Sequence, residues 1–414
     1  DAHDDEEWER LDGSLVGRLE WEGTVEYLGR YLPPGGRVLD VGGGAGRYAV
    51  WLAERGYDVT LVDRRYDRDD PETVVGADVV RVGAPSVSTG LLDGWADHVF
   101  NEGLQAVALG TARSAVAEAD IVHAHNAYVG TRALRLARRS GVPFAYTCHN
   151  GMWCAPDANV YERQVIRRIE GRLLRKSDVP IAVSDAVASG VRQRTSADPR
   201  VVPNGVDVEY YNPSADTTAV RERYDLRDEP VILFVGRLVR AKGVDVLVRA
   251  IARVREETDE RVRLVLVGPN KHMFGGSEGD TYTGRIRRLV DQTGLGSDVV
   301  LAGQIPDDEL RDLYAAADIL ALPSRFEAQG MVLLEALASG TPVVGTDVGG
   351  IPEVITTDVG RVVPSEDHDE LAGALIDVLA DDGQMGRAAR TRAEERYSWD
   401  RIVDDVESAY REVC

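Results

Sequence analysis

Residues 319 to 342 read Ile319-Leu-Ala-Leu-Pro-Ser-Arg-Phe-Glu327-Ala-Gln-Gly330-Met-Val-Leu-Leu-Glu335-Ala-Leu-Ala-Ser-Gly-Thr-Pro342. The first four residues are apolar and predict a buried strand. Gly330 opens an apolar run that predicts a helix, and Glu335 lies about a turn and a half inside it. The N-terminus of a helix favours phosphate, and nearby carboxylates accept hydrogen bonds from hydroxyl groups. The pattern therefore indicates a site for a sugar nucleotide.

This stretch resembles the signature of the retaining glycosyltransferases of family 4. In that signature two Glu are separated by seven residues, in a Pro-Ser-x-x-Glu-x-x-Gly context. Other segments resemble the same family in the same order: Val202–Asp207, Phe234–Gly243, Val348–Glu353 and Tyr397–Trp399. The resemblance covers about residues 75 to 414 and implies an α/β protein with the GT-B fold.

The resemblance also implies roles for individual residues. Arg237 and Lys242 follow a predicted strand on one turn, where two cations can neutralise the diphosphate leaving group. Glu327 would contact the donor sugar, Glu335 the ribose hydroxyls, and His149 would face the donor sugar from the N-terminal domain. The remaining donor-binding residues implied are Gly236, Gly330, Met331, Val332 and Asn204.

The implied activity is transfer of a sugar from a nucleotide diphosphate sugar to a hydroxyl acceptor, with retention of anomeric configuration. This describes a glycosyltransferase of the hexosyltransferase type that requires no cofactor and no metal. The acceptor would be a glycan, a lipid-linked molecule or a polysaccharide. The sequence does not separate uridine, guanosine and adenosine diphosphate donors. One alternative is a sugar-nucleotide-binding protein with impaired catalysis.

Residues 20 to 65 resemble a different family, the class I S-adenosylmethionine-dependent methyltransferases. The resemblance rests on the predicted strand 37–41, the turn Gly42-Gly43-Gly44-Ala-Gly46 and Asp63 at the end of the next predicted strand. In that family the Gly-rich turn approaches the methionine part of the cofactor, and the acid binds its ribose. The same unit can open a Rossmann-like sheet of either family. We expect it to serve the glycosyltransferase, and a methyl-donor site is the second alternative.

The predicted strands form two series separated by a polar stretch, 213–229, which reads as a linker. The first series comprises 37–41, 58–63, 120–124, 143–147 and 179–183, and the second 231–235, 264–268, 299–303, 319–322 and 342–345. Their alternation with helices predicts two Rossmann-like doubly wound domains facing across a cleft. The predicted domains are 1–210 and 211–396, and a helix at 397–414 would cross back to the first.

Two further patterns, one of histidines and one of aspartates, have a spacing that metal ligands can have. His123 and His125 lie at a predicted strand end, where a structural hydrogen-bonding role is expected because a third ligand is not evident. Asp67 and Asp69 have the spacing of a metal-binding pair but lie in an acidic stretch that reads as solvated.

Charge and residue composition indicate which partners and which cellular environment are expected for the protein. The net charge of −22 and pI of about 4.8 argue against nucleic acid as a partner. Nearly all of the 48 basic residues are Arg, and only three are Lys. This favours a halophilic protein, although a GC-rich genome also favours Arg. Three Cys and no apolar run of about 20 residues favour a cytoplasmic protein, with peripheral contact at the inner face of a membrane as an option.

Overall fold

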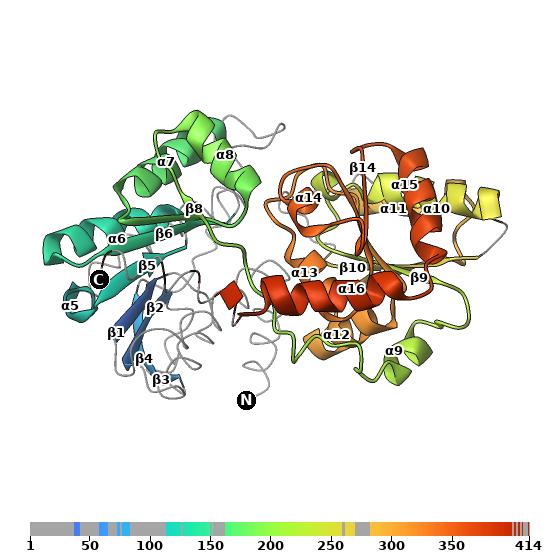
Figure 1. Ribbon diagram of the computed structural model, residues 1–414, viewed down its shortest axis with the longest axis horizontal. Coiled ribbons are helices and arrows are strands. Elements are labelled where there is room, and N and C mark those ends of the chain that lie inside the picture. The colour runs from blue at the N-terminus through green and yellow to red at the C-terminus, as the bar shows by residue number, and fades with distance from the viewer. Residues whose placement is uncertain are drawn as a thin grey trace. The chain divides into compact units, whose positions relative to one another are not determined.

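The computed structural model describes residues 37–41, 58–64, 73–74, 77–82, 113–125, 127–149, 151, 162–258, 261–269, 282–399 and five positions between 401 and 413. These residues form two compact units, each with its own sheet (Figure 1). The N-terminal unit contains the described residues up to Asn204 and those from Trp399 onward. The C-terminal unit runs from Gly205 to Ser398.

The sheet of the N-terminal unit has eight strands in the order β3-β4-β2-β1-β5-β6-β7-β8. Its strands are β1 (Arg37–Val41), β2 (Asp58–Arg64), β3 (Thr73–Val74), β4 (Ala77–Val82), β5 (Ile121–Ala124), β6 (Phe144–Cys148), β7 (Val179–Ala182) and β8 (Arg200–Val201). Its described helices are α5 (Arg113–Glu118), α6 (Ala127–Ser140), the π-helix η3 (Glu162–Ile166), α7 (Arg167–Lys176) and α8 (Asp185–Arg194). All strand pairs are parallel except β3 with β4.

The order of these strands reverses between β1 and β5, which pair directly from Val38 with Ile121. β5 and β6 are buried along their whole length and consist mainly of apolar residues. The reversal point is where doubly wound sheets bind ligands, at the carboxyl ends of the strands. His125 and His149 follow β5 and β6 at that edge.

The sheet of the C-terminal unit has six parallel strands in the order β11-β10-β9-β12-β13-β14. Its strands are β9 (Val231–Val235), β10 (Arg263–Val267), β11 (Val299–Gly303), β12 (Ile319–Leu322), β13 (Val343–Thr346) and β14 (Gly360–Val363). Its helices are α9 (Thr218–Arg223), the 3-10 turn η4 (Arg240–Lys242), α10 (Val244–Thr258), α11 (Tyr282–Gln292), α12 (Asp307–Ala316), α13 (Met331–Ala338), α14 (Ile351–Val354), α15 (His368–Leu379), α16 (Gln384–Arg392) and the π-helix η6 (Ala393–Tyr397).

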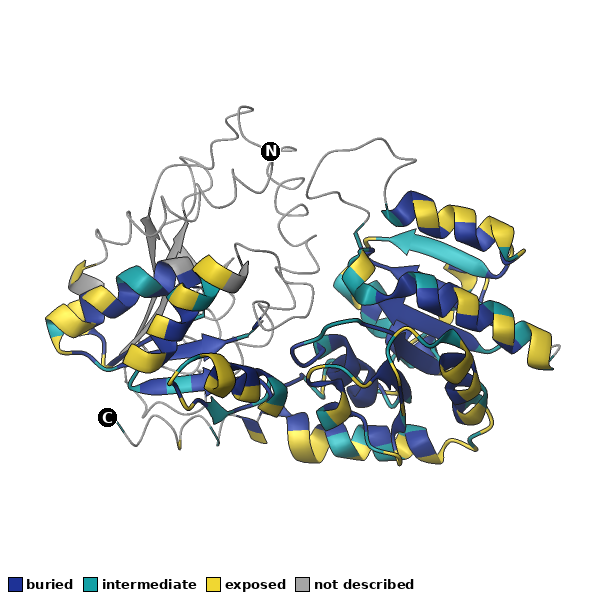
Figure 2. Cartoon of the chain, turned by 90° about the horizontal axis from the view of Figure 1, so that it is seen from above, coloured by how far each residue is buried: buried dark blue, intermediate teal, exposed yellow. Residues whose placement is uncertain are grey.

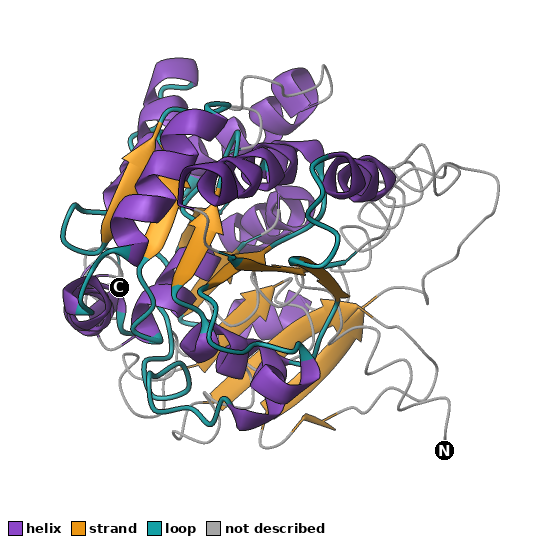
Figure 3. Ribbon diagram, turned by 90° about the vertical axis from the view of Figure 1, so that its right-hand side faces the viewer, coloured by secondary structure: helices purple, strands orange, loops and turns teal. Residues whose placement is uncertain are grey.

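The core of this unit lies around its central strands. β9 and β12 are fully buried, whereas the edge strand β11 is only partly buried (Figure 2). Helices with one buried face lie against the strands (Figure 3). The strand order reverses between β9 and β12, so the loops that follow these two strands meet at the ligand-binding edge.

All ten predicted strands are present, to within one residue at either end. The two parallel doubly wound α/β units are thereby confirmed. Four strands are missing from the prediction: β3 and β8 have only two residues, and β4 and β14 interleave charged residues with Val. No described helix is both long and apolar enough to cross a bilayer.

The polar stretch 213–229 forms part of the C-terminal unit rather than a free linker. It carries α9, and Val220, Tyr224 and Leu226 are buried. These three side chains therefore pack a segment into the unit although most of its residues are polar. The boundary between the compact units falls at Asn204 and Gly205.

Candidate functional site

An ion pair joins the two loops at the reversal point of the C-terminal sheet. Nζ of Lys242, at the end of η4 after β9, lies 2.5 Å from Oε2 of Glu327, in the loop after β12. Ser324 Oγ lies 3.4 Å from the same carboxylate oxygen. The side chains of Lys242 and Glu327 are 20% and 15% exposed. The pair is therefore largely but not completely shielded from solvent.

The backbone fixes how closely these loops approach. Gly243 has φ of +67°, and a Cβ there would lie 1.9 Å from the carbonyl oxygen of Pro323. Only glycine fits, because it tolerates positive φ and lacks the clashing atom. The N–H of Arg325 donates to the carbonyl of Ala241 at 2.8 Å. The loop that carries Glu327 thus packs directly on the turn that carries Lys242.

A second glycine holds the other side of the Glu327 loop. A Cβ at Gly349 would lie 1.7 Å from the carbonyl oxygen of Glu327. The next N–H, of Gly350, donates to that same oxygen at 3.1 Å. The segment after β13 therefore supports the backbone of Glu327.

Glu335 lies on α13 and is 2% exposed. Tyr314 Oη, from α12, donates a hydrogen bond to Oε2 of this carboxylate. Tyr314 is fully buried and packs edge-to-face against Tyr211, with ring centroids 5.8 Å apart. Sequence reasoning missed Tyr314, because it lies 21 residues before Glu335 and outside the quoted motif.

Three other predicted donor-binding residues lie at the start of α13. Gly330 immediately precedes the helix, and Met331 and Val332 are its first two residues. The first N–H groups of a helix have no acceptor within it, so they can donate to an anion.

Two further predicted residues of this unit, Gly236 and Arg237, follow β9. The N–H of Gly236 donates to the carbonyl of Val267 at 2.9 Å and so serves the sheet. Arg237 is half-buried, and within the described part of the chain its guanidinium forms no ion pair.

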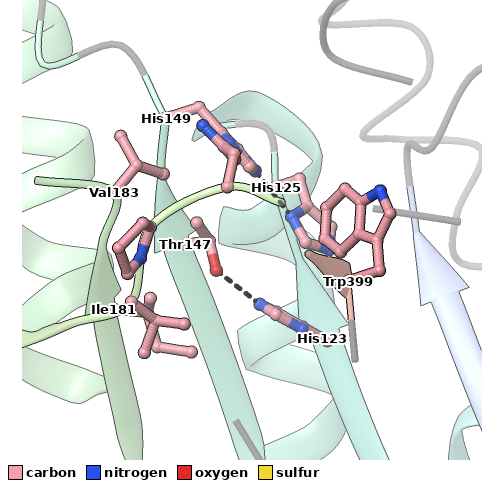
Figure 4. Close-up of a pocket in the computed structure, with 10 residues that line it drawn as sticks. His123, His125, Thr147, His149, Ile181, Val183 and Trp399 are labelled. Carbon is pink, nitrogen blue, oxygen red and sulfur yellow. Dashed lines mark hydrogen bonds between the residues drawn. The ribbon is translucent and has the colours of Figure 1, made fainter. Parts of the chain in front are cut away.

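Three histidines form a separate cluster in the N-terminal unit (Figure 4). Nε2 of His123 lies 2.8 Å from Oγ1 of Thr147, and Nδ1 of His125 lies 2.9 Å from Nε2 of His149. The ring centroids of His123 and His125 are 4.1 Å apart. Together with Asn204 and other residues they line a cavity of about 20 Å³, which is enough for one water molecule.

Burial keeps these imidazoles neutral. It lowers the pKa of His123 to about 3, with a further contribution from His149. It also lowers the pKa of His149 to about 4, although a hydrogen bond to Asn204 acts in the opposite direction. Burial and the two neighbouring histidines also depress the pKa of His125. Its Nε2 is enclosed and has no hydrogen-bond partner in the described residues. A neutral cluster can donate or accept single hydrogen bonds but carries no charge.

The structure brings together Lys242 with Glu327 in one unit and His149 with Asn204 in the other. His123 has the structural hydrogen bond expected of it, while His125 contacts His149 directly. Among the described residues no group of His, Cys, Asp or Glu could hold a metal ion. The predicted Gly loop (Gly42, Gly43, Gly44 and Gly46), Asp67 and Asp69 lie outside the described residues.

Comparison with known families divides the chain into the same two halves. Residues 216–396 match the family described as glycosyl transferases group 1, and residues 42–210 match glycosyltransferase family 4. The second match takes in the Gly-rich turn from Gly42 and Asp63. The resemblance of this stretch to methyltransferases therefore gains no support.

Curated relatives are similar along most of the chain. A D-inositol 3-phosphate glycosyltransferase of Xylanimonas cellulosilytica is 33% identical over 383 residues, which is 87% of this chain and 88% of that protein. One of the same name from Segniliparus rotundus is 32% identical over 380 residues, or 87% and 81% of the two chains.

Solved structures share the fold. Sucrose-phosphate synthase from Thermosynechococcus elongatus has a TM-score of 0.75 at 24% identity, covering 91% of this chain and 99% of that one. Anabaena HepE, in complex with UDP and glucose, has a TM-score of 0.69 at 20% identity, with coverage of 91% and 99%. The chain therefore has the GT-B fold and belongs to the group 1 glycosyltransferases.

Proposed function

We propose that this enzyme transfers a sugar from a nucleotide diphosphate sugar to a hydroxyl acceptor with retention of configuration. One observation carries the proposal: Lys242 and Glu327 meet at the reversal point of the C-terminal sheet, 2.5 Å apart and partly exposed to solvent. A cation there suits the diphosphate, and a carboxylate beside it suits sugar hydroxyls. The buried carboxylate of Glu335 on the adjoining helix suits the ribose.

The proposed reaction is a same-face displacement. The bond between the anomeric carbon and the diphosphate oxygen breaks as the acceptor oxygen bonds to the same face of that carbon. The acceptor proton passes to the departing phosphate oxygen, and Lys242 and Arg237 stabilise the negative charge that develops there. His149 is assigned a hydrogen bond to the donor sugar, which its neutral imidazole can make.

The relatives suggest which substrates to test first. HepE was solved with UDP-glucose and with UDP, which favours a uridine diphosphate sugar as donor. The curated relatives are named for D-inositol 3-phosphate, which makes a phosphorylated cyclitol the first acceptor to test. Lipid-linked and polysaccharide acceptors form the second panel.

The first experiment is calorimetric titration in concentrated KCl with UDP, GDP, ADP and S-adenosylmethionine. We expect one nucleoside diphosphate to bind and S-adenosylmethionine not to bind. Turnover is then measured with the matching sugar nucleotides, and NMR of the product reads its anomeric configuration. A product with inverted configuration would contradict retention but not the transfer of the sugar.

The same experiment separates the alternatives. Binding of a nucleoside diphosphate without transfer to any acceptor, or to water, would indicate a sugar-nucleotide-binding protein with impaired catalysis. Binding of S-adenosylmethionine in place of a nucleotide would contradict the proposal.

A further inference from the structure

Arg325 lies two residues before Glu327, and its guanidinium uses all five of its N–H donors. Nε and Nη2 donate to the two carboxylate oxygens of Glu366, the second at 2.7 Å. Nη1 and Nη2 donate to the two carboxylate oxygens of Asp245 at 2.9 and 3.0 Å. Nη1 also donates to the carbonyl of Arg240 at 2.5 Å. Two bidentate pairs on one fork form a geometrically specific junction.

The junction ties together elements that are distant in sequence. Arg240 and Asp245 flank Lys242 on the turn and first helical residues after β9, whereas Glu366 follows β14. Tyr282, the first residue of α11, donates from Oη to Asp245 at 2.5 Å and accepts from the N–H of Asp245 at 3.1 Å. Arg325 is thus the centre of a network around the edge of the sheet where Lys242 and Glu327 lie.

The backbone of Glu366 has an unusual conformation that the bonds with Arg325 help to hold. Its φ is +70°, one of two positive values among the described residues other than glycine. A side chain in this conformation is strained, and the conformation persists where surrounding contacts hold it. The hydrogen bonds with Arg325 supply such contacts.

The carboxylates of the junction stay ionised. The Arg325 guanidinium lowers the pKa of Glu366. Burial opposes ionisation of Asp245, but hydrogen bonds from Arg325 and Tyr282 outweigh it and leave its pKa below the ordinary value. The side chain of Arg325 is only 12% exposed, whereas those of Asp245 and Glu366 are 35% and 53% exposed, so the junction is shielded from solvent on the arginine side only.

We propose that Arg325 is a positioning residue, which sets the placement of both Glu327 and Lys242 for the donor. Its backbone N–H bonds to the residue before Lys242, its side chain holds both ends of that turn, and Glu327 follows it by two residues. This inference rests on the proposed function of the site. Lysine cannot replace arginine here, because an ammonium group is a point charge without the planar fork.

The test measures transfer kinetics for Arg325→Lys and for Arg325→Ala, alone and combined with Glu327→Gln. A misplacement of about 1 Å can cost about 100-fold in rate. We expect both Arg325 variants to lose about 100-fold in kcat. In the Glu327→Gln background, Arg325→Ala should cost about 10-fold rather than about 100-fold, because one of the two groups that Arg325 positions is already disabled.

Arg390→Lys is the matched control. Arg390 belongs to the same unit and donates from Nη1 to the carbonyls of Val208, Tyr211 and Ala338, away from Lys242 and Glu327. This substitution should lower the melting temperature, and any effect that it has on kcat should add independently to that of Glu327→Gln. Full additivity of Arg325→Ala with Glu327→Gln would overturn the proposal.

Hydrogen exchange separates this inference from the proposed function. Arg325→Ala should speed exchange in residues 240–245 and 323–330 and leave β9 and β12 unchanged, whereas Arg390→Lys should not affect the two loops. Unchanged exchange in both loops would refute the positioning role even in an active enzyme. Wild-type protein that transfers no sugar, with the expected exchange pattern, would refute the function and keep the positioning role.

Discussion

Lys242 and Glu327 are separated by 85 residues in sequence, and each shields the other's charge. Removing one member of such a pair leaves the other as a partly buried charge without its counter-ion. The resulting loss of stability is larger than the stability that the pair itself contributes. The pair also holds the cation near the position where phosphate charge would develop. Loss of either side chain should therefore affect both catalysis and stability.

We expect Lys242→Ala to reduce kcat/KM for transfer by about 100- to 1,000-fold, the range seen when one electrostatic stabiliser is removed. The far-ultraviolet circular dichroism spectrum should stay unchanged, because no core contact is lost. Steady-state kinetics with the donor found by titration measure the effect. Near-native turnover would show that Lys242 does not serve the diphosphate.

Tyr314→Phe should weaken recognition of the ribose. The substitution removes the hydroxyl that holds Glu335 but keeps the ring that packs on Tyr211. Wild-type protein should bind the nucleoside diphosphate at least 10-fold more tightly than its 2′,3′-dideoxy analogue, and the variant should lose most of that preference. Tyr211→Phe is the control and should keep it. An unchanged preference in Tyr314→Phe would show that the contact between Tyr314 and Glu335 does not serve recognition of the ribose.

The histidine cluster predicts a loss of stability in acid. Below about pH 6.5 the unfolded chain protonates His123, whereas the folded chain does not do so until about pH 3. The unfolded state therefore binds more protons in this window, and the free energy of unfolding falls as pH falls, by about 1.4 kcal/mol per pH unit for this residue. Urea unfolding at pH 7.5, 6 and 5 measures the slope. His123→Gln should flatten it, and an identical slope in the variant would contradict the cluster's neutral state.

At the scale of elements, close backbone contacts at glycines help to shape the loops of the C-terminal unit. Gly349→Ala should destabilise the protein by about 1–3 kcal/mol and abolish most transfer, because its Cβ would displace the carbonyl of Glu327. Gly373→Ala, in α15 with no neighbour within 4 Å, should be neutral or stabilising by up to about 1 kcal/mol. Thermal unfolding and kinetics of the two variants measure the contrast. Equal effects would contradict the steric argument.

The long apolar strands were predictable from sequence because each has a continuous run of buried residues bounded by turn residues. The short or mixed strands, such as β8 and β14, were not, because their pairing depends on neighbours distant in sequence. Lys242 and Glu327 could be predicted as members of one site because both lie in motifs that resemble those of family 4. The parts played by Arg325 and Tyr314 depend on contacts across 80 and 21 residues, which no local pattern encodes.

At the scale of the whole molecule, a net charge of −22 makes self-repulsion a general cost of the compact state. The Debye length falls from about 10 Å at 0.1 M salt to about 3 Å at 1 M, which screens that repulsion. We expect the melting temperature to rise steadily from 0.1 to 2 M KCl. Sucrose, an uncharged osmolyte, is the control for excluded-solute effects. A melting temperature independent of KCl would contradict a halophilic character.

The contacts at Gly243 and Gly349 also bear on how such an enzyme can acquire new substrates. Both loops of the site are held at backbone atoms where no Cβ fits, so lengthening or shortening either by one residue would misalign the two at once. Divergence of donor preference must then proceed by exchange of side chains on a constant main chain. Libraries for directed evolution should accordingly vary the residue type of side chains around the site, and leave Arg237, Lys242 and the length of both loops unchanged.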